Sequence, residues 1–530
     1  MTRNILLRSI VLGLILLITL NVSAQNKYWV FLSDKNNVEF NPYEYFDQKA
    51  IERRIDQGLP IYDITDMPLN KGYVTQIEEI ANDVNFQSRW FNALSIVIST
   101  EEQKNEILKL PFVKKITKSE TYSLIFATYS NEIDDEVDKD KEMMHMKQTE
   151  RMGGKLFEKN NIRGKGIRIA VFDGGFPQVD EHPAFEHLRE NKQIIKTYDF
   201  TKKEENVYHG HKHGRMTLAC IGGIYKGVKI GLATEAEYLL ARTEINTEPF
   251  SEEENWLAAA EWADKNGANI ISSSLGYGKN RYFTSNMNGK NSLVVKAANM
   301  AARKGILVVN SAGNEATKSW KAIITPADGD SVLTVGGIDP KTDYHISFSS
   351  YGPTADKRLK PNVSAYGHVV TAGKEELTTV DGTSFSCPLT AGFAACAWQT
   401  KKDFSNMELF KEIEKSGHLF PYFDYAHGYG IPQAKHFVSK IDNPPKQTFE
   451  FKKDEESLKV IVLPNVVNQT EWLVANTLLF YQIIDTEGMI KKYFVVKVEQ
   501  NEALELKLKD FSPNEKIKVH FRGYTKSITF

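Results

Sequence analysis

The chain has 530 residues, of which 25% are charged and 41% are hydrophobic, and its formal net charge is -2. This length allows two to four domains, and the composition is that of a folded globular protein. The balanced charge argues against nucleic acid as a partner. The three cysteines, Cys220, Cys387 and Cys396, form neither a disulfide framework nor a zinc pattern.

The N-terminus has the pattern of a secretory signal peptide, which we expect at residues 1–24. Arg3 and Arg8 flank the start of an apolar segment, residues 10–20 carry no charge, and small residues precede Gln25. The uncharged run is short for a transmembrane helix, and no other segment is long and apolar enough to span a membrane. We therefore expect an exported protein, secreted or at the cell surface, without stable membrane insertion.

Residues 25–118 are predicted to form a small α+β domain. Strands are expected at 28–32 and 93–98 and helices at 43–55 and 101–110, and residues 112–116 follow the second helix. Within the first of these helices, Arg53 and Arg54 are expected to be exposed. Residues 131–142 are nearly all charged, and such a run cannot bury itself. We therefore expect an exposed acidic linker at 119–144.

Residues 145–441 alternate apolar β-branched runs with helical stretches. Strands are expected at 167–172, 238–241, 270–275, 306–309 and 332–335, and helices at 252–266 and 292–304. Buried strands separated by helices predict a mostly parallel sheet covered on both faces, an α/β fold.

From residue 442 onward the pattern changes at Asp442-Asn443-Pro444-Pro445. Short strands are expected at 458–463, 478–484, 493–498, 504–508 and 517–521. Helix signals are weak in this stretch, so residues 442–530 are predicted to form a small β-sandwich.

The stretch from Asp381 to Pro388 contains the candidate nucleophile. Gly382 allows a tight turn, and a buried helix rich in small residues follows. Ser384 would lie at the start of this helix, near the positive end of its dipole, with Pro388 in about the first turn. The alternative is that Ser384 only caps the helix.

A catalytic serine needs a base and an orienting carboxylate. Asp173 ends a predicted buried strand, where α/β proteins bind ligands, although it could simply cap a turn. His213 opens a stretch of small and apolar residues. Histidines stand at every second position, at His209, His211 and His213, so a metal site is an alternative. However, no pattern of carboxylate or thiol residues that could complete such a site accompanies them.

Asn314 follows a predicted strand in the sequence Ala312-Gly313-Asn314. Its amide could donate a hydrogen bond to a developing oxyanion. The alternative is an ordinary turn asparagine beside a glycine.

Five landmarks in this order resemble those of the subtilisin-like serine peptidases, and the resemblance covers about residues 145–440. They are Asp173 with its glycines, His213-Gly214, Ser274-Leu275-Gly276, Ala312-Gly313-Asn314 and Gly382-Thr383-Ser384-Phe385-Ser386-Cys387-Pro388. Each motif is weak alone, but the ordered set on a parallel α/β pattern is specific.

The resemblance implies a role for each of these residues. Ser384 would be the nucleophile, His213 the general base and then acid, and Asp173 the group that holds the imidazole. Asn314 would stabilise the oxyanion together with the Ser384 backbone N–H. Ser274, Leu275 and Gly276 would form an edge strand that pairs with the substrate backbone.

The sequence also departs from the pattern of this family. His209-Gly210 is a competing His-Gly pair, and His213 is preferred for the register of the stretch that follows it. Arg215 replaces a usual Thr, which puts the local geometry of the cleft in question, and Phe385 replaces a common Met. Residues 221–233 are short and poor in Asp and Asn, so the calcium loop of many relatives is expected to be absent. We predict no metal and no cofactor.

The flanking regions also resemble known parts. Residues 25–118 resemble the propeptide of such proteases, which would act as a folding aid and an intramolecular inhibitor. Residues 442–530 weakly resemble sorting domains of the type IX secretion system, which would make the outer-membrane secretion machinery a partner. The alternative for this stretch is a plain accessory β-domain.

The expected function is therefore that of a secreted serine endopeptidase, made as a zymogen, which hydrolyses polypeptides. One alternative is a peptide-binding protein that keeps the fold but has lost the chemistry. The retention of Asp173, His213, Asn314 and Ser384 argues against it. A lipase or esterase is disfavoured because Ser384 does not lie in a Gly-x-Ser-x-Gly motif.

Overall fold

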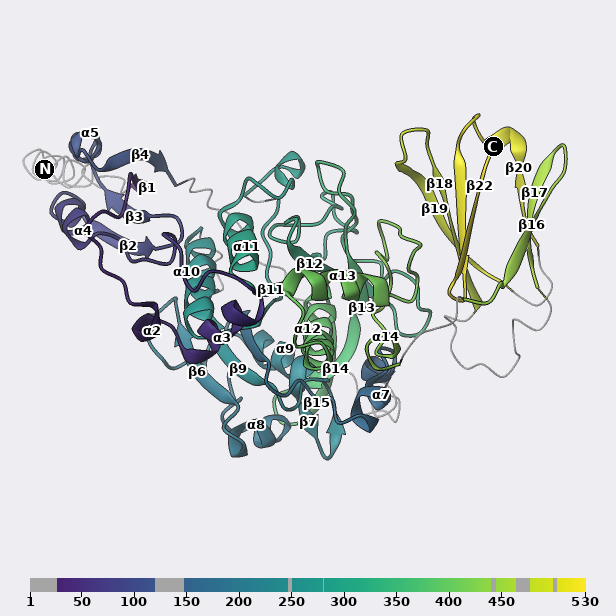
Figure 1. Cartoon of the computed structure of the whole chain (residues 1–530), viewed down its shortest axis with the longest axis horizontal. Coiled ribbons are helices and arrows are strands. Elements are labelled where there is room, and N and C mark those ends of the chain that lie inside the picture. The colour runs from purple at the N-terminus through teal and green to yellow at the C-terminus, as the bar shows by residue number, and fades with distance from the viewer. Residues whose placement is uncertain are drawn as a thin grey trace, which may run out of the picture. The chain divides into compact units, whose positions relative to one another are not determined.

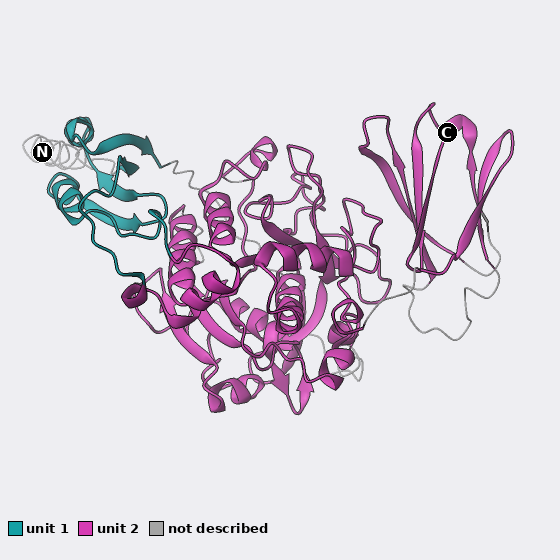
Figure 2. Cartoon of the chain, viewed as in Figure 1, with its two compact units in different colours: residues 1–42, 62–122 teal, residues 43–61, 123–530 magenta. Residues whose placement is uncertain are grey.

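The computed structural model describes residues 26–119, 147–245, 250–279, 281–439, 445–463, 477–498 and 503–530 (Figure 1). The expected signal peptide and the acidic run 131–142 lie outside these ranges. The chain divides into unit 1, Met1–Pro42 with Tyr62–Tyr122, and unit 2, Tyr43–Ile61 with Ser123–Phe530 (Figure 2). Within the described ranges, no helix is long and apolar enough to cross a membrane.

Unit 1 is a four-stranded antiparallel sheet with helices, as predicted. The strand order is β2-β3-β1-β4. Its elements are β1 (Asn26–Leu32), α4 (Lys71–Glu78), β2 (Asp83–Ser88), β3 (Ala93–Ile98), α5 (Glu101–Lys109) and β4 (Val113–Lys118). A capping box of Thr100 and Gln103 starts α5. The elements α4 and β2 were not predicted, because both are short and neither has a clear periodic pattern of apolar residues.

Unit 2 contains a seven-stranded parallel sheet, which confirms the predicted α/β fold. The order is β13-β12-β11-β10-β5-β9-β6. The strands are β5 (Arg168–Asp173), β6 (Ile194–Asp199), β9 (Glu237–Arg242), β10 (Ile270–Ser273), β11 (Leu307–Ser311), β12 (Val332–Ile338) and β13 (Val363–Tyr366). Six of them have no exposed residue, and the exception is the edge strand β6.

Helices cover both faces of this sheet. The larger ones are α9 (His213–Gly222), α10 (Ser251–Lys265), α11 (Leu293–Arg303), α12 (Thr383–Thr400) and α13 (Asn406–Ser416). Ile169 and Val171 of β5 share a core with α9 and α12, whereas the next residue, Phe172, packs edge-on against Trp256 of α10. Because neighbouring strand residues point to opposite faces, α10 lies on the face opposite α9 and α12.

Shorter elements complete the peptidase part. They are α7 (Gly154–Lys159), η1 (Pro183–Phe185), α8 (Glu186–Glu190), β7 (Ile224–Tyr225), β8 (Val228–Lys229), η2 (Thr284–Asn286), β14 (His368–Ala372), β15 (Leu377–Asp381) and α14 (Lys435–Val438). The β14–β15 hairpin leads directly into α12. All three cysteines are buried and free, as their isolated spacing indicated.

Residues 43–61 belong to unit 2, although they lie in the sequence between two parts of unit 1. They contain the end of α2 (Pro42–Tyr45) and all of α3 (Gln48–Asp56). The expected exposure of Arg53 and Arg54 is wrong, because the two residues are only 2% and 1% exposed. Both form ion pairs with the buried carboxylate of Asp264.

The C-terminal region is all-β, as predicted, with sheets β16-β17-β20 and β19-β18-β21-β22. The strands are β16 (Phe449–Lys453), β17 (Ser457–Val462), β18 (Leu478–Ile484), β19 (Ile490–Lys497), β20 (Ala503–Lys507), β21 (Lys516–Phe521) and β22 (Tyr524–Thr529), with η4 (Leu508–Asp510). Both sheets contribute to one apolar core. The strands β16 and β22 were not predicted, because their residues are mostly polar or only half-buried.

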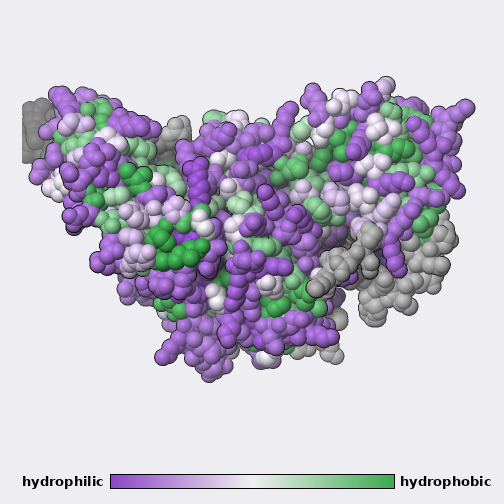
Figure 3. Space-filling model, in the orientation of Figure 1, coloured by the Kyte–Doolittle hydropathy of each residue, from purple (hydrophilic) through white to green (hydrophobic). Residues whose placement is uncertain are grey.

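In the face shown in Figure 3, hydrophobic residues appear only in small patches.

Candidate active site

The predicted site residues gather at the edge of the sheet where three neighbouring strands end. Asp173 is the last residue of β5, Ser273 the last of β10 and Ser311 the last of β11. Two helices start near this edge, α9 at His213 and α12 at Thr383. In a parallel sheet all carboxyl ends lie on one side, so segments distant in sequence meet there.

The Asp173 carboxylate holds the His213 ring. His213 Nδ1 lies 2.9 Å from both Oδ1 and Oδ2 of Asp173, and the two side chains are 9% and 1% exposed. The Gly174 N–H donates to Oδ1 at 2.7 Å, and the Thr217 hydroxyl donates to Oδ2 at 3.0 Å. These bonds place the Nδ1 proton toward the carboxylate and leave Nε2 to accept a proton.

Thr217 was not among the site residues predicted from the sequence. It lies four residues after His213 on α9, so both side chains lie on the same face of the helix. A hydroxyl residue one turn after a candidate histidine is the signal that could have identified it.

The glycine after His213 is required by packing. A Cβ atom at Gly214 would lie 2.9 Å from Asp173 Cβ and 2.2 Å from the Gly175 carbonyl oxygen. Any side chain there would push the start of α9 away from the end of β5. The glycine after His213 therefore lets His213 approach Asp173 closely enough to bond with it.

The three alternating histidines have different environments. His209 Nε2 lies 3.1 Å from Glu204 Oε1 and 3.5 Å from Asp199 Oδ2. The ring of His211 accepts the His213 backbone N–H at 3.2 Å. Asp199, Glu204 and His209 have ligand atoms within 4.8 Å of one another. Arg242 donates to Asp199 at 2.8 Å, so we interpret this group as an ion-pair network.

Arg215 bonds to residues outside the candidate triad. Its guanidinium donates to Gln178 Oε1 and, at 3.4 Å, to the Ala372 carbonyl oxygen. The Arg at this position therefore leaves the Asp173–His213 contact intact. The Phe385 ring lies beside the imidazole, with ring centres 5.4 Å apart.

Ser384 lies in the first turn of α12, after a sharp turn at Gly382, whose φ is 148°. Its hydroxyl donates to the Ser274 carbonyl oxygen at 3.4 Å, and its side chain is only partly buried. Pro388 lies in the second turn, slightly further into the helix than expected.

Pro388 also explains a bond between the helix and the loop after β10. Proline has no N–H, so the Ser384 carbonyl, four residues earlier, lacks its helical donor. The Ser274 hydroxyl donates to this carbonyl oxygen at 2.7 Å. Ser274 thus fixes the backbone of Ser384, a role that no local pattern indicated.

The Asn314 amide is oriented by Thr383. Asn314 Oδ1 accepts the Thr383 N–H at 3.0 Å and the Thr383 hydroxyl at 2.9 Å. These two donors assign the oxygen end of the amide. The donor end, Nδ2, lies 3.6 Å from the position of a Cβ atom at Gly382. Asn314 therefore presents an N–H donor beside the turn that carries Ser384.

The segment Ser274-Leu275-Gly276 follows β10 and is not itself part of a strand. The Leu275 carbonyl oxygen accepts from Asn310 Nδ2 at 3.0 Å. A Cβ atom at Gly276 would lie 2.5 Å from Ile324 Cδ1. The segment is held in place on one side, and its pairing with a substrate backbone stays a prediction.

Residues that follow this segment contact a buried acidic cluster, which was not predicted. The Tyr277 hydroxyl donates to Glu244 at 2.7 Å, and Arg281 donates to Glu252 at 2.8 Å and to Glu253 at 3.3 Å. Burial, reinforced by the neighbouring Glu244 carboxylate, raises the pKa of Glu252 to about 10. Burial also raises the pKa of Glu244 and of Glu253.

Comparison with known families gives two matches. Residues 164–430 match the profile described as the subtilase family, Peptidase S8. Residues 27–134 match the profile of the Peptidase S8 propeptide domain of Bacteroidota.

Individual proteins show the same similarity. Serine protease AprX of Bacillus subtilis (strain 168) is 27% identical over 362 residues, which cover 60% of this chain and 77% of that protein. Subtilisin BL of Lederbergia lenta is 25% identical over 256 residues, 48% of this chain and 84% of that protein. A crystal structure of MycP1 with its N-terminal propeptide removed aligns with 57% of this chain and 99% of that chain, at 21% identity and a TM-score of 0.44.

Proposed function

The chain belongs to the subtilase family and is a serine-type endopeptidase, and on that premise we propose that Asp173, His213 and Ser384 are its catalytic triad. The observation that carries this proposal is the bond of His213 Nδ1 to both oxygens of a buried Asp173, at the sheet edge where α12 brings Ser384. Asn314 is the proposed side-chain donor to the oxyanion.

The proposed reaction proceeds in two halves. The Ser384 hydroxyl turns from the Ser274 carbonyl toward His213 Nε2, gives it a proton and attacks the carbonyl carbon of the peptide. Asp173 stabilises the imidazolium that forms. Asn314 Nδ2 and the Ser384 backbone N–H donate to the negative oxygen of the tetrahedral intermediate. The imidazolium then protonates the leaving amine, and water hydrolyses the acyl-enzyme with the same base.

We further propose that the protein is a secreted zymogen. The propeptide match at 27–134 and the compact fold of unit 1 support an N-terminal intramolecular inhibitor. The signal pattern at 1–24 supports export. The C-terminal β-region is proposed to be either a sorting domain that engages the secretion machinery or a plain accessory domain.

Labelling with a fluorophosphonate probe tests the triad directly. The purified, processed protein should label on Ser384 and hydrolyse a peptide library, and both signals should disappear in Ser384→Ala. Cleavage of the library would also define specificity. A folded protein that binds peptides but takes no label would contradict the proposal and favour a peptide-binding role.

A further inference from the structure

Residues 43–61, called the strap here, cross the edge of the sheet opposite the candidate active site. Arg168, the first residue of β5, donates to Asp47 Oδ1 at 3.1 Å. Lys49 donates to the Gly166 carbonyl oxygen at 2.8 Å and lies 3.1 Å from Glu237, the first residue of β9. The strap therefore lies where the parallel strands begin, whereas Asp173 and Ser384 lie where they end.

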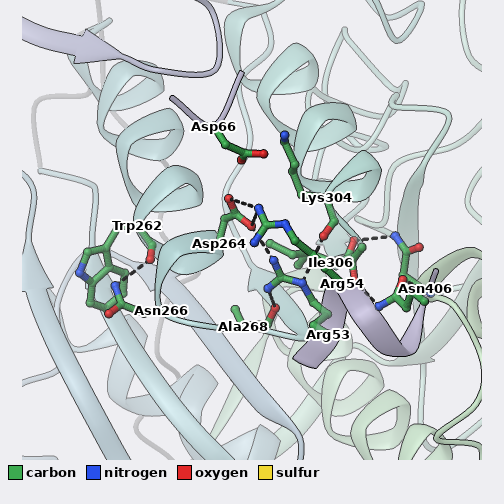
Figure 4. A network of polar contacts seen from close by, with 12 residues as sticks. Arg53, Arg54, Asp66, Trp262, Asp264, Asn266, Ala268, Lys304, Ile306 and Asn406 are labelled. Atoms are coloured by element: carbon green, nitrogen blue, oxygen red, sulfur yellow. Dashed lines mark hydrogen bonds and ion pairs between the residues drawn. The ribbon is translucent and has the colours of Figure 1, made fainter. Parts of the chain in front are cut away.

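Two arginines of the strap enter a socket formed by the ends of α10 and α11 (Figure 4). Arg54 donates to Asp264 Oδ1 at 3.0 Å and Oδ2 at 3.1 Å. Arg53 donates to Asp264 Oδ1, to the Ala268 carbonyl oxygen and, at 3.2 Å, to the Lys304 carbonyl oxygen. The Arg53, Arg54 and Asp264 side chains are at most 1% exposed.

The charges in this socket are complementary. Asp264 lies in the last turn of α10, where the helix dipole disfavours a negative charge, and the Ala268 and Lys304 carbonyls follow the ends of α10 and α11. Two guanidinium groups compensate this negative potential, and their forks provide several donors in fixed directions. The Arg54 guanidinium also stacks on the ring of Phe46 in the strap itself, 4.0 Å from its centre.

Two glycines of the peptidase part, Gly267 and Gly305, leave space that the strap fills. A Cβ atom at Gly267 would lie 2.6 Å from Lys49 Cβ and 2.9 Å from the Ala50 nitrogen. A Cβ atom at Gly305 would lie 2.9 Å from the Gln57 Oε1 and Leu59 Cδ1 atoms. Both glycines have positive φ, and both leave room that α3 and its C-terminal extension fill.

We propose that the strap is a lasting part of the active enzyme, bound to the catalytic part through Arg53 and Arg54 independently of unit 1. The strap lies at the edge away from Ser384, so its binding leaves the catalytic edge open. It therefore stabilises the peptidase, while inhibition belongs to unit 1. This inference rests on the proposed function only for the activity measurement, because binding is measured separately.

The test uses the full chain carrying Ser384→Ala, with recognition sites for a specific protease inserted after Pro42, after Ile61 and within 120–146. After complete cleavage, gel filtration and denaturing mass spectrometry measure whether peptide 43–61 elutes with the catalytic fragment. We expect it to co-elute in a one-to-one ratio. Arg53→Ala with Arg54→Ala should weaken its binding by on the order of 100-fold, because one side of a buried ion pair is lost. Arg303→Ala, an exposed arginine on α11, is the matched control.

Two further measurements make the result decisive. In the uncut chain, amide hydrogen exchange of residues 48–57 should be slow and should accelerate locally in the double arginine variant, even if the cut form is unstable. The same cut chain with Ser384 intact should hydrolyse peptides while peptide 43–61 is bound. Separation of the peptide from the unsubstituted catalytic fragment, equal retention in the double variant, or inhibition by the bound strap would each overturn the inference. An enzyme that retains the strap but is inactive both with the strap bound and after its removal would contradict only the proposed triad.

Discussion

Asn314 illustrates how the fold can orient a single amide. Its Oδ1 atom is occupied by the N–H and the hydroxyl of Thr383, at 3.0 Å and 2.9 Å, so Nδ2 remains as the donor. The geometry thus assigns the two ends of the side chain, which a sequence pattern cannot do.

Replacing Asn314 should therefore lower kcat with little change in KM. Asn314→Asp keeps the acceptor for Thr383 but replaces the donor with a second carboxylate oxygen that is negatively charged when ionised, whereas Asn314→Ala removes both the acceptor and the donor. We expect a loss in kcat of about 10²–10³-fold in both variants, a magnitude known for such donors in subtilisin itself and not obtained from this geometry. Steady-state kinetics on a fluorogenic peptide measure it. An unchanged kcat in a folded variant would exclude Asn314 from the oxyanion role.

The two His-Gly pairs give a second prediction. His213 bonds to Asp173, whereas His209 bonds to Glu204 in a separate ion-pair network. His213→Ala should abolish hydrolysis, and His209→Ala should retain most of it, as measured on the same peptide substrate. The reverse result would assign the role of general base to His209.

Ser274 is expected to act as a positioning residue through its bond to the Ser384 carbonyl. Ser274→Ala should lower kcat about 2- to 10-fold, the equivalent of one ordinary hydrogen bond, with KM less affected. Pro388→Ala in the same chain supplies an N–H four residues after Ser384 and should restore part of the loss. If the double variant is no better than Ser274→Ala, the carbonyl bond is not the cause.

At the scale of elements, the first turn of α10 has an unusual composition. Glu252, Glu253 and Glu254 favour a helix start through the dipole, yet all three are buried. Glu252 accepts the Ile245 N–H at 3.0 Å and contacts Arg281. The cluster joins α10 to the loop after β10, so its protonation affects how these elements pack.

The raised pKa of Glu252 predicts a pH dependence of stability. Its pKa in the folded chain is about 10, against an ordinary value of 4.5, so between these pH values the folded state binds more protons than the unfolded state. Stability then falls as pH rises through this window, by at most about 1.4 kcal/mol per pH unit from this group.

Glu252→Gln removes this titration while keeping the shape of the protonated acid. The difference in Tm between variant and unsubstituted protein should therefore grow in favour of the variant from pH 5 to pH 9. Thermal unfolding of the two proteins across this range measures it, and Glu190→Gln, an exposed glutamate at the end of α8, is the control. A difference that does not vary with pH would show that Glu252 is ionised in the folded protein.

At the scale of the whole molecule, the proposed zymogen needs a cut between unit 1 and the peptidase part, and release of unit 1 with the strap retained needs further cuts on both sides of residues 43–61. We expect this cut between residues 119 and 143, because proteases favour exposed charged linkers. If the cut is autocatalytic, Ser384→Ala should accumulate as a precursor that starts at Gln25. Mass spectrometry of both secreted proteins would show this difference. Covalent attachment of residues 27–116 in fully active protein would contradict the zymogen proposal.

The sequence by itself was sufficient to predict the features that depend on local patterns of residues. Apolar runs predicted the main strands of the parallel sheet because strands buried on both faces need unbroken hydrophobic residues. The residues around Asp173, His213, Asn314 and Ser384 lie in turns and at helix starts, and the residue preferences of such segments can also be recognised locally. Their order along the chain identified the family before any contact was known, and the family match confirms that identification.

Only the tertiary structure decided the features that depend on contacts between distant segments. The burial of Arg53 is decided by Asp264, the backbone bond of Ser384 by Ser274, and the burial of Glu252 by Arg281. In each case a polar group is buried because a partner compensates the loss of water, and a linear pattern cannot identify that partner. An arginine pair on a helix therefore suggests a solvated face until the fold brings a carboxylate to it.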